Sequence, residues 1–289
     1  MPTLQPADVP RFLAHLSRRF PPSRFPPLAP SLVPLLTSLP LSHASLFLRP
    51  CLNLALHHLP LTPSPVPPEP RLPFDDAQLH PRRFVVRQFK EALVKSAVLV
   101  GVPRAIECLL EVQECVDEGD RSRAFVRGGL DEAGKTLGER KDAGTAGLRI
   151  VYKHHLDEIF TRMHREGLDD LRFLSQSVTY GTFLTPFPPF SPHLPSHLSP
   201  DPLACQSDPR LLSLITLPLL LAQRTPREIL WHLRGALRLG WRRDEVEVLQ
   251  GAVEEVAEKC GVRGIGEGVP RVRDVEVQEE ERQRADRER

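Results

Sequence analysis

Hydrophobic residues recur every three or four positions from Pro81 to Val100, the spacing that places them on one face of an α-helix. Gly101 is a natural end for this helix, because glycine tolerates the backbone conformation that closes helices. Pro103 follows at a position where the first turn of a new helix accepts proline. The pattern therefore predicts two consecutive helices joined by a tight corner, the second ending near Val116.

The same spacing recurs later in the chain. It predicts helices over residues 148–165, 168–184, 211–221, 226–239 and 244–260. A bend is expected in the third of these, because Pro218 lies inside it. The chain shows neither the sustained alternation of apolar and polar residues that marks a half-buried strand nor a hairpin dipeptide between two such stretches. An all-α fold is therefore expected.

Proline interrupts the N-terminal part of the chain. More than half of the 31 prolines precede Arg82, and each limits the length of a helix or strand. Residues 31–58 are apolar and predict two short helices, broken at Pro40 and Pro50. A proline-rich linker without a core of its own follows at residues 59–73.

These contrasts in composition divide the chain into three parts. They are a proline-rich region with short helices at residues 1–75, a helical domain at 81–262 and a charged tail at 263–289. Within the domain, residues 117–147 are rich in glycine and charged residues and poor in large apolar ones. Such a composition rarely anchors a core, so it favours a flexible, solvated insert.

Charge and hydropathy exclude several classes of protein. The formal net charge is +1, so no global attraction to nucleic acid or to an anionic membrane is expected. The longest apolar runs are shorter than the roughly 20 residues that cross a bilayer, which predicts a soluble protein without membrane contact.

The five cysteines bear on the compartment. They form no CxxC or zinc-ribbon spacing, and their odd number argues against a secreted disulfide framework. A reducing compartment, the cytoplasm, is therefore expected. The mitochondrion is an alternative, because residues 1–66 hold five arginines and one acidic residue, the bias of a transit peptide, although prolines there would interrupt its amphipathic helix.

The strongest local signal is the start of the helix that follows Thr225. Thr225 is a capping residue, Pro226 suits the first turn, and Glu228 could complete a capping box. Glu228, His232 and Gly235 then fall on one flank of the apolar stripe. A carboxylate and an imidazole are therefore expected side by side at the border of the core. Gly235 would let a ligand or another helix come close to them.

One stretch of the chain resembles the helix pair of carboxymuconolactone decarboxylase-like and alkylhydroperoxidase D-like proteins. It runs from Thr225 to Leu249 and reads TPREILWHLRGALRLGWRRDEVEVL, against a family signature of His-Leu-x-Gly-Ala, then Gly, then an acidic Glu-Val helix. Looser likeness extends upstream: KSAVLVGVPRAIECL looks like the family's recurring segment, and VYKHHLDEIF and VTYGTFL look like the middle segment of fungal members. The resemblance implies the alkylhydroperoxidase D-like helical fold and homo-oligomers.

Within that family, cysteine content decides between two chemistries. Peroxidase relatives carry a Cys-x-x-Cys pair ahead of the histidine, and Thr225 and Glu228 stand at those positions here. A dithiol cycle needs one thiolate to attack peroxide and a second thiol to resolve the product, so a thiol-dependent antioxidant function is a disfavoured alternative. Decarboxylase relatives use neither cysteine nor cofactor, and no cofactor is expected here.

The resemblance thus implies cofactor-free acid/base chemistry on a small carboxylated, lactone or carbonyl compound. His232 and Glu228 would be the catalytic residues, and a cation would hold the substrate carboxylate. The candidates for substrate binding are Arg227, Arg234, Arg104 and Tyr180. A hydrogen-bonded structural histidine is the plainer alternative for His232.

A departure from the family keeps a third function open. After Gly240 the turn reads Trp241-Arg242-Arg243, where relatives usually have a small residue and a threonine cap. A pocket tuned to one substrate could have changed with this turn. The third function is that of a non-catalytic oligomeric interaction protein, with the proline-rich segments and the charged tail as contact surfaces.

Other patterns are rejected on context. Residues 129–136 fit the phosphate-loop motif GxxxxGK[ST] letter for letter, but no buried strand is expected before them and no helix after them. Cys108 and Cys115 share a helix face about 10 Å apart, too far for a disulfide. His154 and His155 are adjacent and point to different faces. Neither a nucleotide site nor a metal site is therefore predicted.

Overall fold

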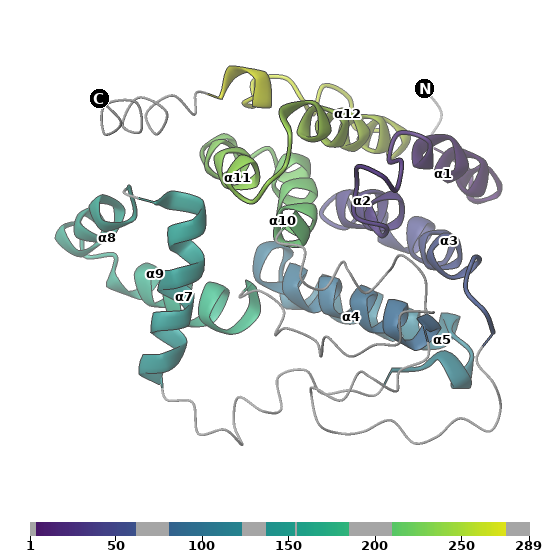
Figure 1. Cartoon of the computed structure of the whole chain (residues 1–289), viewed down its shortest axis with the longest axis horizontal. Coiled ribbons are helices and arrows are strands. Elements are labelled where there is room, and N and C mark those ends of the chain that lie inside the picture. Colours follow the sequence, from purple (N-terminus) through teal and green to yellow (C-terminus); the bar gives the residue numbers. More distant parts are fainter. Residues whose placement is uncertain (1–3, 62–80, 123–136, 154, 185–209, 276–289) are drawn as a thin grey trace.

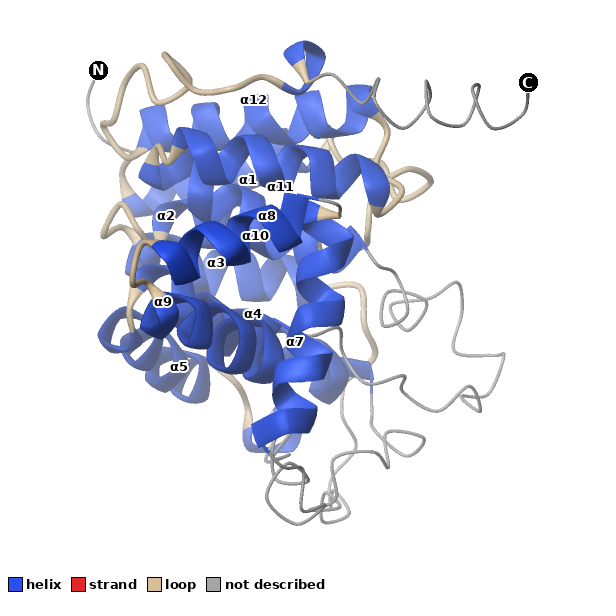
Figure 2. Ribbon diagram, turned by 90° about the vertical axis from the view of Figure 1, so that its left-hand side faces the viewer, coloured by secondary structure: helices blue, strands red, loops and turns tan. Residues whose placement is uncertain are grey.

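The computed structural model describes residues 4–61, 81–122, 137–153, 155–184 and 210–275. Within these ranges the chain forms eleven α-helices, one π-helix and three short 3-10 helices, and no strand (Figures 1 and 2). The expected all-α fold is therefore confirmed. None of the helices in the described ranges is both long and apolar enough to cross a membrane.

Three helices come from the proline-rich N-terminal region. They are α1 (Val9–Ser17), which follows the short helix η1 (Pro6–Asp8), α2 (Ala29–Ser38) and α3 (Ala44–Leu56). The predicted break at Pro40 is confirmed, because it falls between α2 and α3. The predicted break at Pro50 is wrong, because Pro50 lies inside α3. Phe47 and Cys51 beside it are fully buried, and this packing offsets the hydrogen bond that proline cannot donate.

The main core crosses the boundary between the proline-rich region and the predicted helical domain. Every residue of α2 except Pro30 is buried, and this helix lies against α3, α10 (Arg210–Gln223) and α12 (Arg243–Lys259) (Figure 1). Leu36, Leu217 and Val253 from three of these helices belong to one buried cluster. The change of composition near residue 75 is thus not a boundary in packing.

Helices α4 (Pro81–Val100) and α5 (Val102–Cys115) form the predicted pair around a tight corner. Gly101 has a φ of +93°, in the region that favours glycine, and Pro103 lies in the first turn of α5. The short helix η3 (Glu118–Asp120) follows.

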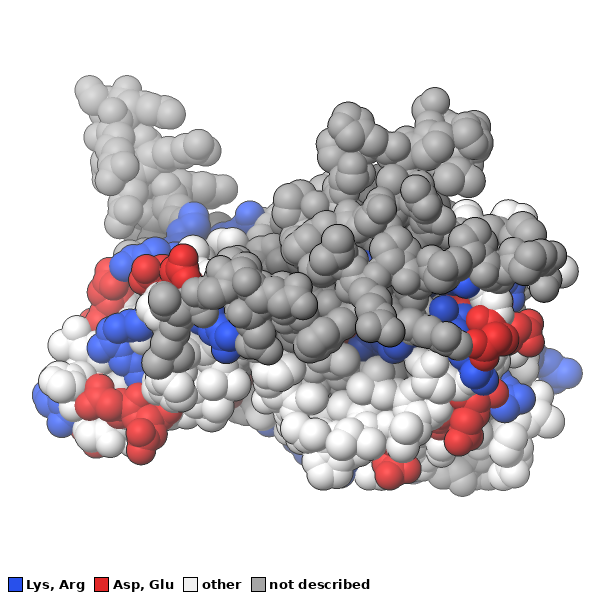
Figure 3. All heavy atoms as spheres, turned by 90° about the horizontal axis from the view of Figure 1, so that it is seen from below, with Lys and Arg blue, Asp and Glu red and all other residues white. Residues whose placement is uncertain are grey.

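Seen from below in Figure 3, Lys and Arg residues lie next to Asp and Glu residues on the described part of that face, so no single sign of charge dominates there.

Helix α7 (Leu137–Tyr152) begins inside the segment predicted to be a flexible insert, so that prediction is wrong for residues 137–147. Residues 117–122 of the predicted insert are described and include η3, whereas residues 123–136, with the phosphate-loop letters, lie outside the described residues, although a helix does follow them. Gly144 is helical here, and a Cβ at this position would overlap the backbone carbonyl oxygen of Gln176. Glycine therefore lets two helix backbones touch, rather than making a turn.

Both helices predicted between residues 148 and 184 are divided. α7 ends at Tyr152, Lys153 takes a φ of +48°, and α8 (His155–Arg165) begins. The next helix consists of α9 (Asp169–Phe173) and the π-helix η4 (Leu174–Leu184), which packs along α7. A π-helix is rare, and it often occurs at functional sites.

The C-terminal helices match the prediction closely. α10 contains Pro218, α11 spans Pro226–Arg238, and α12 ends just before Cys260. The short helix η6 (Val272–Asp274) is attached to α12, because the amide of Gln250 donates to the Pro270 carbonyl at 2.9 Å and accepts from the Val272 nitrogen at 3.0 Å. Part of the predicted charged tail therefore packs on the fold, and residues 276–289 lie outside the described ranges.

Candidate functional site

The helix that carries His232 starts differently from the predicted capping box. Thr225 precedes α11, but its hydroxyl contacts the Leu220 carbonyl at 3.4 Å and caps no nitrogen of α11. The predicted capping box is therefore wrong, because the backbone angles of Thr225, φ −97° and ψ 85°, are not those of a capping residue and its side chain makes no capping hydrogen bond. An equivalent contact lies at α12 instead, where the Arg242 nitrogen donates to Oε2 of Glu245 at 2.9 Å.

His232 of α11 is buried and faces Tyr180 of η4. The residue is only 8% exposed, and its Nε2 lies 3.5 Å from the hydroxyl oxygen of Tyr180. Burial lowers the pKa of His232 to about 4, so the imidazole is neutral at pH 7. A neutral imidazole has one nitrogen that accepts a proton and one that donates. The structure thus brings together two residues that the sequence suggested separately.

Tyr152 completes the cluster from the end of α7. Its ring stands edge-on to the ring of Trp231, with centroids 5.1 Å apart. Burial raises the pKa of Tyr152, and the negative charge of Glu228 raises it further. Burial also raises the pKa of Tyr180, with a smaller contribution from Tyr152. Glu228 therefore acts on Tyr152, whereas His232 meets Tyr180.

Two glycines make this arrangement possible. A Cβ on Gly147 of α7 would lie 3.2 Å from Cδ1 of Tyr180, and a Cβ on Gly235 of α11 would lie 3.2 Å from Cγ1 of Val151. The close approach expected at Gly235 is therefore made by another helix, α7. Gly147 and Tyr152 were not among the predicted site residues, although the chain has only two tyrosines and both lie in this cluster.

The predicted arginines are not gathered at His232. Arg104 is exposed on α5 and donates to the Pro40 carbonyl at 2.6 Å, so it holds α5 to the corner between α2 and α3. Arg227 and Arg234 lie about 140° and 160° around α11 from His232, given the 3.6 residues per turn. Arg238, which the sequence pattern does not single out, donates instead to the Val151 carbonyl beside Tyr152.

The cysteines are poorly suited to thiol chemistry. Burial raises the pKa of Cys108 to about 11 and that of Cys260 to about 12, and it raises the pKa of Cys51 as well. Thiolate is therefore scarce at pH 7 at these positions. Cys205 lies outside the described residues, and within them no group of His, Cys, Asp and Glu side chains could hold a metal ion.

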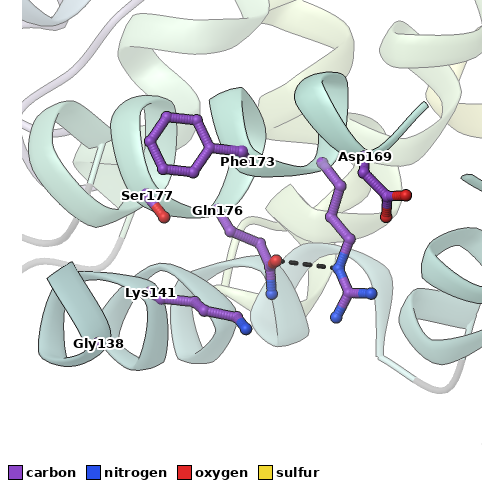
Figure 4. Close-up of a pocket in the computed structure, with 7 residues that line it drawn as sticks. Gly138, Lys141, Asp169, Phe173, Gln176 and Ser177 are labelled. Carbon is purple, nitrogen blue, oxygen red and sulfur yellow. Dashed lines mark hydrogen bonds between the residues drawn. The ribbon is translucent and has the colours of Figure 1, made fainter. Parts of the chain in front are cut away.

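A cavity of about 430 Å³ lies between the first half of α7 and the α9–η4 segment (Figure 4). None of the predicted site residues lines it. The residues that do so are Gly138, Lys141, Asp169, Arg172, Phe173, Gln176 and Ser177. The described residues therefore offer two candidate sites: the buried tyrosine–histidine cluster and this open pocket.

Comparison with known proteins adds no relative. No protein-family model, no curated protein and no solved structure matches the chain. The family resemblance of residues 225–249 is therefore supported by their sequence alone, and the all-α architecture is supported by the helices of the structure.

Proposed function

We propose that the chain is a carboxymuconolactone decarboxylase-like helical protein that performs cofactor-free acid/base chemistry on a small carboxylated, lactone or carbonyl compound. The observation that carries this proposal is a neutral, buried imidazole within reach of a phenol, at His232 and Tyr180. The family resemblance falls on the same helix and includes the same histidine.

The long distance between the Tyr180 hydroxyl and the His232 imidazole suggests that both groups can still hydrogen-bond to a ligand. Their 3.5 Å distance exceeds the roughly 2.8 Å of a well-formed hydroxyl hydrogen bond, so neither side chain is saturated by the other. Catalytic hydrogen bonds are often long before substrate binds. In this proposal the Tyr180 hydroxyl donates to a carbonyl or lactone oxygen, and His232 accepts a proton from the carbon or water that reacts.

The low pKa of His232 fits a base that works only when substrate is present. With a pKa of about 4, the imidazole is a weak base in the empty site. A substrate carboxylate next to it would stabilise the imidazolium and raise that pKa toward neutrality. We take Arg238, which donates to the Val151 carbonyl beside Tyr152, as the cation in place of Arg104. Burial raises the pKa of Tyr152, and the charge of Glu228 raises it further, so this phenol stays a hydrogen-bond donor.

Turnover of candidate substrates tests this proposal. We expect His232→Gln to lower kcat/KM at least about 100-fold and Tyr180→Phe to lower it about 10- to 100-fold, because each loses a proton-transfer group. The assay follows loss of carboxylated lactones and oxo-acids by the purified chain. His57→Gln, which changes an exposed histidine at the end of α3, is the matched control and should keep full activity. Equal rates in wild type and His232→Gln would rule the proposal out.

A second function is favoured by one surface feature. Val102, Ile106 and Leu110 form an apolar stripe along α5 and are 58, 46 and 57% exposed. Their spacing of four residues is symmetric about Ile106, so two antiparallel copies could pair Val102 with Leu110. Such self-association would make the chain an oligomeric interaction protein. A chain that self-associates but neither binds nor converts any candidate substrate would favour this function.

A further inference from the structure

The open pocket lies between the first half of α7 and the α9–η4 segment, and neither His232 nor Tyr180 lines it. Its volume of about 430 Å³ falls within the roughly 300–1,000 Å³ typical of small-molecule sites. Phe173 and the alkyl stem of Lys141 give it apolar wall, and Gly138 leaves room at one end. The proposed chemistry at His232 makes no use of this space.

Buried polar groups are built into the pocket. Gln176 is 3% exposed, and its amide nitrogen donates to Oγ1 of Thr145 at 3.0 Å. Ser177 is 4% exposed and lines the same pocket, yet the structure gives its hydroxyl no hydrogen bond with another described residue. In Figure 4 the Lys141 side chain extends toward the amide of Gln176. This hydroxyl is not one of the fully buried polar atoms that lack a partner, so it is accessible from the cavity and can hydrogen-bond to a ligand oxygen there.

Two contacts orient the guanidinium of Arg172 so that it could bind an anion. Its Nε donates to Oε1 of Gln176 at 3.0 Å, the bond that is dashed in Figure 4, and its guanidinium lies over the Phe160 ring at 4.6 Å. These two contacts fix the plane of the guanidinium. Its terminal nitrogens make no hydrogen bond or ion pair with the described residues, so they can face a carboxylate in the bidentate geometry that arginine favours.

The charge of the pocket indicates which anion fits. Lys141 and Arg172 contribute two positive charges, and Asp169 contributes one negative charge that is already held by Nδ1 of His164 at 3.0 Å. One net positive charge matches a monoanion better than the dianion of a phosphate ester. We propose that this pocket binds a small organic monocarboxylate, with its carboxylate at Arg172 and Lys141 and its body against Phe173 and Ser177.

Isothermal titration of the full-length chain tests this assignment with three matched probes. They are 3-phenylpropanoate, its uncharged amide 3-phenylpropanamide, and the dianion phenyl phosphate. We expect the carboxylate to bind with a Kd below about 1 mM and at least about tenfold more tightly than either other probe. No measurable carboxylate binding, equal binding of the amide, or tighter binding of phenyl phosphate would overturn the proposal.

Variants locate the binding within the molecule. Arg172→Gln should weaken carboxylate binding at least about tenfold, whereas Arg165→Gln, an exposed arginine nearby, should leave it unchanged. Arg172 also hydrogen-bonds to Gln176, so its replacement could disturb packing. Lys141 is exposed at the rim of the pocket, and Lys141→Met therefore provides a second test. We expect Lys141→Met to weaken carboxylate binding at least about threefold. Unchanged affinity in both variants would contradict the assignment. His232→Gln should bind the probe normally, so this proposal and the proposed chemistry fail independently.

Discussion

Replacing Gly144 by alanine is expected to lower the free energy of unfolding by about 3 kcal/mol or more. The new Cβ would overlap the backbone carbonyl oxygen of Gln176 and would come within 2.8 Å of the Gly181 nitrogen. Backbone atoms inside a helix cannot swing aside as a side chain can. α7 and η4 would therefore have to separate, which would also pull Tyr180 away from His232.

A second helical glycine provides the control for this experiment. A Cβ on Gly251 of α12 would meet only the end of the flexible Arg19 side chain, at 3.0 Å. Because alanine is a better helix former than glycine by about 1 kcal/mol, Gly251→Ala should leave stability unchanged or raise it. Urea unfolding followed by circular dichroism compares both variants with wild type. Wild-type stability of Gly144→Ala would show that α7 and η4 do not pack backbone to backbone.

Acidification is expected to destabilise the protein through His232. The pKa of this histidine is about 4 in the folded chain, against an ordinary value of 6.5. Above pH 6.5 the imidazole is neutral in both states, so it makes no difference to stability. As pH falls from 6.5 toward 4, the unfolded chain takes up the proton first, and stability is lost. The loss from this group should reach about 2 kcal/mol by pH 5.

The contribution of His232 is isolated by comparison with a variant that does not titrate there. The free energy of unfolding is measured at pH 7.5 and at pH 5 for wild type and His232→Gln, and the drop should be about 2 kcal/mol smaller in the variant. His57→Gln, which changes an exposed histidine, should drop as wild type does. The same drop in wild type and His232→Gln would mean that this imidazole is not buried as described.

Strong periodicity explains why much of the fold could be predicted. α4, α10, α11 and α12 each carry a sustained apolar face or an apolar run bounded by clear end signals, and they lie where expected. The first half of α7 could not be predicted, because Gly144 and Gly147 resemble loop residues until the helix against them is known. That partner, η4, lies about thirty positions later in the chain.

The site could be predicted only in part for a similar reason. His232 and Tyr180 were each recognisable, but they are 52 positions apart and meet only because α7 holds η4 beside α11. The segment that resembles the family suggests a site role for Arg104, but this arginine donates to the Pro40 carbonyl, in the N-terminal region that composition separates from the helical domain. The threonine of the expected capping box shows the same limit, because the letters fit while the backbone angles at Thr225 do not.

Ligand-induced thermal stabilisation tests the central claim, that His232 and Tyr180 form a ligand site, most directly. Wild type, His232→Gln and Arg172→Gln are melted with a panel of small lactones, oxo-acids and dicarboxylates, because a ligand of the folded state raises Tm by mass action. We predict at least one compound that raises the Tm of wild type and of Arg172→Gln but leaves that of a cooperatively melting His232→Gln unchanged. If every stabilising compound acts equally on wild type and His232→Gln, or if none stabilises wild type, the claim is contradicted.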